Sequence, residues 1–129
     1  LAKADRFHGV WPHWLHGPTG KVKPFGTKDD GGDLVESSFL MQSLLCVRQY
    51  VKDGNEKEKA LAAKIDELWH GMEFDWYRNG DQNVLYWHWS PNYGWEKIAE
   101  QGLHLVCEPC FYLQKMVFLS KVLRQRFDV

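Results

Sequence analysis

The sequence predicts a mainly α-helical protein built on a pair of helices with long aromatic-rich loops. Apolar residues cover most of the circumference of a helix predicted over residues 34–52. A second helix, predicted from residue 55 to about 77, has a single apolar stripe. A helix that is apolar nearly all round is buried on several sides, whereas a single stripe marks a half-exposed helix. One buried helix followed by one half-exposed helix is the unit of an α/α barrel.

Composition and charge narrow the possible functions. The 129 residues are 44% hydrophobic and 26% charged, which predicts one globular domain and argues against disorder. The net charge is −1 without a basic block, so we expect no nucleic-acid partner. No apolar run is long enough to span a membrane. The chain starts at Leu1 without a signal peptide and reads as an internal part of a protein.

The segment before the first helix is predicted to be irregular. Six glycines and three prolines within residues 1–32 interrupt any helix. Residues 11–15 and 21–25 are expected to form two short strands around the turn at residues 17–20.

The two helices have recognisable ends. Gly54 is a plausible stop for the first helix. Asn55 is a good N-cap for the second, with Glu58 at the third helical position. The apolar stripe of the second helix consists of Leu61, Ile65, Leu68 and Met72.

The remaining segments carry less information. Residues 79–96 are expected to be irregular with a strand at 83–89, and residues 111–127 to form a third helix. Cys46 is interpreted as a small core residue. Cys107 and Cys110 form a single CxxC pattern, and the odd cysteine count argues against a disulfide framework. We expect no metal site and no cofactor, since the histidines lack metal-ligand spacing.

Four carboxylates surround a double glycine at residues 29–36. Asp33 and Glu36 are three apart at the start of the first helix, so both project toward one side. They form either a capping box or an acid–base pair. Crowding by Asp29 and Asp30 favours the acid–base pair. Among neighbouring carboxylates the pKa of one is raised, so it can act as the acid while an ionised neighbour acts as the base. The glycines at 31 and 32 either form a tight turn or let the backbone approach a ligand.

An aromatic segment follows about fifty residues later. In a strand, Trp87 and Trp89 face the same side and His88 the other. A second group contains Trp11, His13 and Trp14. Each group is either part of the core or a stacking wall for sugar rings. Carboxylates together with such aromatic groups indicate carbohydrate chemistry. The candidate sugar-binding residues are Trp11, His13, Trp14, Asp29, Asp30, Tyr86, Trp87, His88, Trp89, Tyr93 and Trp95.

These motifs, in this order, resemble the bacterial glycoamylase-like glycoside hydrolase family, which includes endo-β-1,2-glucanases. The resemblance covers residues 7–96, and the matching stretches are residues 9–14, 19–25, 29–45, 82–91 and 93–95. It implies part of an (α/α)6 toroid, with inner and outer helix pairs and a glucan-binding cleft. It also implies hydrolysis of β-linked glucan, most of all β-1,2-glucan, with inversion at the anomeric carbon. The resemblance further implies that Asp33 and Glu36 are catalytic.

The chain departs from this family in two respects. A complete family domain is several times longer, so residues 1–129 are interpreted as a single partial domain. Residues 97–129 diverge, and the family's Gly-aromatic-Asn-Glu pattern is absent there.

The alternatives are a non-catalytic glycan-binding protein and an inactive helical fragment that associates with itself through exposed apolar faces. The expected partner is an oligo- or polysaccharide. The resemblance also implies export to a bacterial periplasm or cell envelope.

Overall fold

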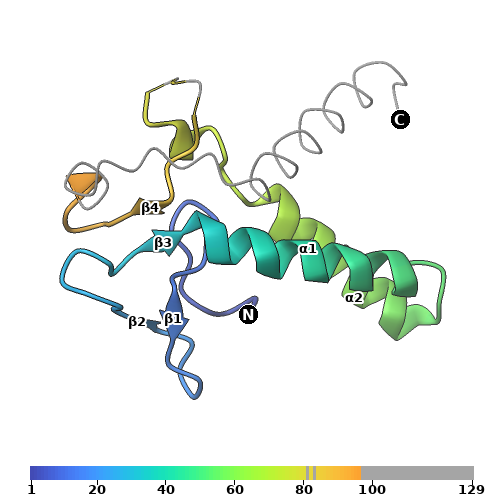
Figure 1. Ribbon diagram of the computed structural model, residues 1–129. Helices are drawn as coiled ribbons and strands as arrows, with labels where there is room; N and C mark the ends of the chain where they lie inside the picture. Colours follow the sequence, from blue (N-terminus) through green and yellow to red (C-terminus); the bar gives the residue numbers. More distant parts are fainter. Residues whose placement is uncertain (81, 83, 97–129) are drawn as a thin grey trace.

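The computed structural model describes residues 1–80, 82 and 84–96, and its regular structure is mainly α-helical. Helices α1 (Leu34–Val51) and α2 (Glu56–His70) lie side by side and antiparallel, joined by a short loop (Figure 1). The predicted helix pair is therefore confirmed. The helix predicted at residues 111–127 and the CxxC pattern lie outside the described residues.

Four short strands gather near the N-terminal end of α1 (Figure 1). β1 (Trp14–Leu15) pairs antiparallel with β2 (Val22–Lys23), which confirms the predicted hairpin. β3 (Gly32–Asp33) pairs antiparallel with β4 (His88–Trp89), with Gly32 opposite Trp89 and Asp33 opposite His88. β4 lies within the strand predicted at residues 83–89, but it is shorter.

Capping explains where both helices begin. Asp33 is the N-cap of α1, and Asn55 forms a complete capping box with Glu58 at the start of α2. The prediction that the second helix continues to about residue 77 is wrong, because α2 ends at His70. Beyond Gly71, the Glu73 N–H donates to the carbonyl of His8 at 3.0 Å instead of continuing the helical pattern. The short 3₁₀ helix η1 (Trp76–Arg78) follows.

The core lies between the helix pair and the loops that cross it. Arg6 ties the N-terminal segment to α2, since its guanidinium donates to the carbonyl of Leu68 at 2.9 Å and lies over the ring of Trp11. The main cluster of buried apolar residues comprises Val10, Trp11, Leu34, Met41, Leu68, Trp69, Met72, Phe74, Tyr77 and Leu85.

Burial of α1 on several sides is not observed within the described residues. Phe39, Val47 and Tyr50 are 49%, 43% and 89% exposed, and Cys46 is also exposed, which corrects its assignment to the core. Leu61 of α2, assigned to the buried stripe, is exposed as well. The physical reason is that the described chain packs against one face of α1. Self-association through the other face stays a prediction.

A bidentate ion pair fixes how the two helices face each other. Arg48 of α1 donates from Nε and Nη2 to the carboxylate of Asp66 on α2, both at 3.0 Å. Neither of these two described helices combines the length and apolarity needed to cross a membrane.

The close approach of β3 to β4 depends on glycine. A Cβ atom on Gly31 would lie 2.0 Å from the carbonyl oxygen of Trp89, and one on Gly32 would lie 2.0 Å from the hydroxyl of Tyr77. The chain itself, rather than a ligand, occupies the space that these glycines leave open.

We therefore expect Gly31→Ala to lower the free energy of unfolding by about 1–3 kcal/mol or more, because the added methyl group must displace backbone. Urea unfolding monitored by tryptophan fluorescence measures this change. Gly26→Ala is the matched control, since nothing lies within 4 Å of its added Cβ. Equal stability of the two variants would contradict the tight β3–β4 contact.

Candidate active site at the start of α1

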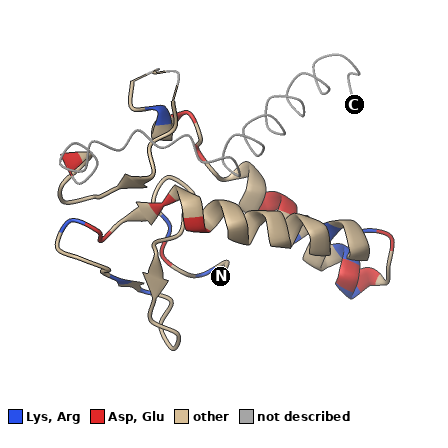
Figure 2. Cartoon of the chain, in the orientation of Figure 1, with Lys and Arg blue, Asp and Glu red and all other residues tan. Residues whose placement is uncertain are grey.

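Motifs that are far apart in the sequence meet at the N-terminal end of α1. The N–H of Asp33 donates to the carbonyl of Trp11, and the N–H of Leu34 donates to that of Trp87, both at 2.8 Å. Figure 2 shows acidic residues at this end of the helix. The acidic segment, the aromatic segment and the Trp11 segment therefore share one hydrogen-bonded junction.

The carboxylate of Asp33 is fully buried, and both of its oxygens have partners. Oδ1 accepts the N–H of Glu36 at 3.0 Å, which caps α1. Oδ2 lies 3.0 Å from Nδ1 of His13. The predicted cap is confirmed, but the reciprocal half of the capping box is not formed, because Asp33 donates its own N–H to Trp11.

Glu36 is the exposed acid of this segment. Its backbone N–H is held by the cap, which fixes the first turn of α1. Within the described residues, no hydrogen bond or ion pair engages its carboxylate. The side chain of Glu36 is therefore accessible in the described part of the chain, whereas that of Asp33 is engaged by its neighbours.

Tyr77 supports the junction from the interior. It is fully buried, and its hydroxyl donates to the carbonyl of Phe7 at 2.9 Å. Burial, reinforced by the negative charges of Asp33 and Glu73, raises the pKa of Tyr77 far above its ordinary value. Tyr77 therefore remains a neutral donor. Sequence reasoning missed this residue, and no local pattern marks it.

Asp29 and His88 form a buried pair. Oδ1 of Asp29 lies 3.0 Å from Nε2 of His88, and the two residues are 3% and 0% exposed. Such a carboxylate needs a polar partner in the interior. The pair links the loop before β3 to β4. The predicted contact of either residue with substrate stays a prediction.

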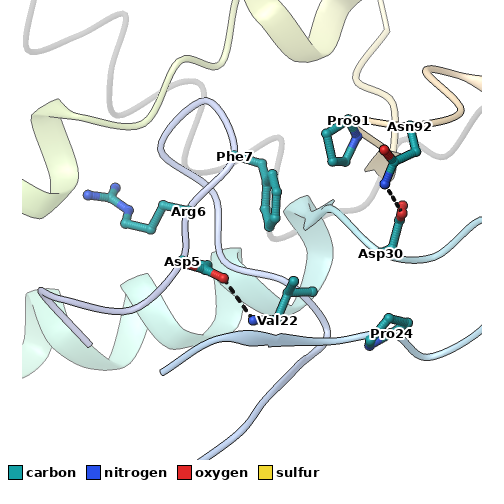
Figure 3. A pocket seen from close by; sticks show the side chains of 8 residues that line it. All are labelled: Asp5, Arg6, Phe7, Val22, Pro24, Asp30, Pro91 and Asn92. Atoms are coloured by element: carbon teal, nitrogen blue, oxygen red, sulfur yellow. Dashed lines mark hydrogen bonds between the residues drawn. The ribbon is translucent and has the colours of Figure 1, made fainter. Parts of the chain in front are cut away.

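Asp30 has different surroundings, at the edge of an open hollow. Its carboxylate accepts hydrogen bonds from Oγ of Ser90 and, at 2.6 Å, from Nδ2 of Asn92. Ser90 also accepts the N–H of Tyr93 at 2.9 Å. Sequence reasoning missed Ser90 and Asn92, although Ser-Pro-Asn is a turn composition. The hollow is lined by Asp5, Arg6, Phe7, Val22, Pro24, Asp30, Pro91 and Asn92 (Figure 3).

One partly exposed aromatic group adjoins the junction. Trp14 and Phe25 are 45% and 51% exposed, and their ring centroids are 4.7 Å apart. The ring of His13 lies 4.4 Å from that of Phe25, while its Nδ1 contacts Asp33. His13 and Trp14 were predicted to bind sugar, whereas Phe25 was missed.

A second aromatic group consists of His8, Trp76 and Trp89. The ring of His8 stacks on that of Trp76 with centroids 3.6 Å apart, and Trp89 meets both rings edge-on. Trp89 was among the predicted sugar-binding residues. Trp76 was not, and it comes after the last residue of the apolar stripe predicted for the second helix.

The other predicted aromatic residues lie deeper. Trp11 and Tyr86 are buried, so both are core residues in this chain, as one of the two interpretations expected. Trp95 packs against Tyr86 and Tyr77 at centroid distances of 5.2 and 6.0 Å. Trp87 and Tyr93 are half-buried. The sugar contacts of these residues stay predictions.

No group of three His, Cys, Asp or Glu side chains among the described residues is arranged to hold a metal ion.

Comparison with known proteins finds homologues that match most of this chain. An exo-β-1,2-glucooligosaccharide sophorohydrolase of Parabacteroides distasonis is 54% identical over 97 residues, which are 74% of this chain and 14% of that protein. An endo-β-1,2-glucanase of Chitinophaga pinensis, solved with sophorotriose and glucose, is 75% identical with a TM-score of 0.72. The chain is therefore homologous to a part of proteins named β-1,2-glucanase, sophorohydrolase and glucoamylase. The resemblance predicted from the sequence is thereby confirmed.

A glucoamylase-like protein of Bacteroides caccae shows the same relation, with 69% identity and a TM-score of 0.73. This chain spans 22% of the Chitinophaga structure and 23% of the Bacteroides structure, with 74% of its own length matched in each. None of the protein-family models searched matches the chain.

Substitution of Asp33 separates its two roles in stability. Asp33→Asn keeps the helix cap, since Asn is an equally good N-cap, but it removes the charge beside His13. We expect a loss of about 1–2 kcal/mol in the free energy of unfolding for Asp33→Asn, and about 2–4 kcal/mol for Asp33→Ala, which also loses the cap. Urea unfolding measures both, and equal losses would show that the cap contributes nothing.

The raised pKa of Tyr77 predicts destabilisation at alkaline pH. An unfolded tyrosine loses its proton near pH 10, while the buried folded one retains it. The contribution of Tyr77 is therefore complete below pH 10 and declines as the pH rises above it. Tyr77→Phe should show a smaller loss of stability between pH 8 and pH 11 than the wild type, in chemical unfolding.

Tyr50→Phe is the matched control, because Tyr50 is 89% exposed. If both variants follow the wild-type pH dependence, the ionisation of Tyr77 is not linked to folding.

Proposed function

We propose that this chain forms part of the catalytic cleft of a glycoside hydrolase that cleaves β-linked glucan, with β-1,2-glucan as the preferred substrate. The observation that carries the proposal is the 75% identity to an endo-β-1,2-glucanase solved with sophorotriose and glucose. The meeting of acids and aromatic rings at the start of α1 supports it. The chain spans only part of these relatives, so the homology alone does not establish its activity.

The proposed reaction is a single displacement with inversion at the anomeric carbon. One carboxylate removes a proton from the attacking water, and one carboxylic acid protonates the leaving glycosidic oxygen. Glu36 is favoured as the group that meets the reactants, because its side chain is exposed on a fixed helical turn. Asp33 is favoured as the group that orients His13 and the start of α1.

The helix pair suits a toroid. In this proposal α1 is an inner helix and α2 an outer helix of an (α/α)6 arrangement. Exposed Phe39, Val47 and Tyr50 support an inner position for α1, since such apolar residues pack against further elements when these are present. Export to a periplasm or cell envelope remains part of the proposal, on the family resemblance alone.

Glycan binding without hydrolysis is the second candidate. It is favoured by the sequence after Glu96, which lacks the Gly-aromatic-Asn-Glu pattern expected from the family resemblance. The aromatic groups around His13 and His8 are formed by residues that precede that segment.

A chimaera tests the proposal. The matched segment of the Chitinophaga glucanase is replaced by that of this chain, and reducing-sugar release is measured on β-1,2-, β-1,3- and α-1,4-glucan. We expect release from β-1,2-glucan, and a loss of roughly 100-fold or more in kcat for Glu36→Gln, since acid–base groups contribute about 10²–10⁴-fold.

Glu56→Gln is the matched control, because Glu56 lies on the exposed first turn of α2. A folded chimaera that is silent on all three glucans would contradict hydrolysis and favour glycan binding. Full activity of Glu36→Gln would remove Glu36 from the reaction.

A further inference from the structure

The hollow bordered by Asp30 has the size of a small-molecule site. Its volume is about 460 Å³, and typical ligand pockets measure roughly 300–1,000 Å³. Phe7, Pro24 and Pro91 supply apolar surface, while Asp30 and Asn92, the latter beside Pro91, supply polar groups (Figure 3). A pyranose ring presents this same combination of C–H surface and hydroxyl groups.

The polar groups of the hollow are held in place without a ligand. One Asp30 oxygen accepts from Ser90 and the other from Asn92. An ionised carboxylate has roughly four acceptor positions, so two anchored bonds leave capacity for further donors. Hydroxyl groups of a ligand are such donors, and the side-chain carbonyl of Asn92 is an additional acceptor.

The charges around the hollow favour a neutral ligand. Lys21 is paired with Asp5 at 3.0 Å, and Asp5 also accepts the N–H of Val22 at 2.9 Å. The guanidinium of Arg6 points away from the hollow (Figure 3), toward the carbonyls of Gly9 and Leu68. With these cations engaged elsewhere and Asp30 at the wall, a phosphate or carboxylate ligand would be repelled.

We propose that this hollow is a carbohydrate subsite that takes one glucosyl unit of a β-linked glucan. Asp30 and Asn92 bond its hydroxyl groups, and Phe7 and Pro91 contact its C–H face. The identity of the sugar rests on the proposed function. The subsite itself rests on the geometry of the hollow, three residues along the chain from Asp33.

The test is a titration of the isotopically labelled chain with sophorose, the β-1,2-linked disaccharide of glucose, followed by amide chemical shifts. We expect the largest shifts at residues 5–7, 30 and 90–93. Asn92→Ala should raise the Kd about fivefold, the factor expected for one lost hydrogen bond. Glucose 6-phosphate should bind more weakly than glucose.

Gln49→Ala is the matched control, because Gln49 is an exposed side-chain amide on α1 that does not line the hollow. It should leave the Kd within about twofold. If Asn92→Ala does not fold, Asn92→Ser replaces it, since Ser also suits a turn. No shifts in the folded wild-type chain, or an unchanged Kd in the folded Asn92 variant, would overturn the subsite. Weakening by Gln49→Ala alone would do the same.

The subsite and the hydrolase activity can be contradicted by different results. A chimaera that hydrolyses β-1,2-glucan with the same KM in its Asn92→Ala form would overturn the subsite and leave the hydrolase proposal standing. Sophorose bound in the hollow, with no hydrolysis by the chimaera, would support the subsite and contradict the hydrolase.

Discussion

The buried carboxylate of Asp33 is the interaction on which the arrangement of this chain depends. A carboxylate without partners would strongly destabilise the interior. Here one oxygen caps α1 and the other contacts His13. The backbone at the same point bonds the Trp11 segment and pairs with His88. A single residue thus places α1, the first hairpin and the aromatic segment relative to one another.

The acidic segment is not one uniform charged patch. Asp29 faces His88, Asp30 faces Ser90 and Asn92, and Asp33 faces His13. Each of these acids ties the segment to a different neighbour, and three close carboxylates are tolerated because each has its own polar partner. Glu36 is set apart by its exposure, and its part in the proposed reaction rests on that difference.

The junction also relates the two open surfaces. The aromatic group of His13, Trp14 and Phe25 connects to Asp33 through His13, while the hollow connects to β3 through Asp30. Both surfaces are therefore fixed to the same short strand. In the proposed glucan hydrolase, surfaces held on one rigid element would keep successive sugar units in register with the reacting bond.

The sequence by itself determined much of the local structure and the resemblance to β-1,2-glucanases. The Asp33 cap, the Asn55 capping box, the hairpin around residues 17–20 and the glucanase-like motifs are all short-range patterns that one segment can carry. Tertiary structure alone decided which side chains are buried. Trp11 and Tyr86 lie inside, whereas Cys46 and Leu61 lie outside, because burial depends on which segments pack together. The side-chain partners of Asp29, Asp30 and Asp33 belong to this second class, since residues 20 to 62 positions away supply them.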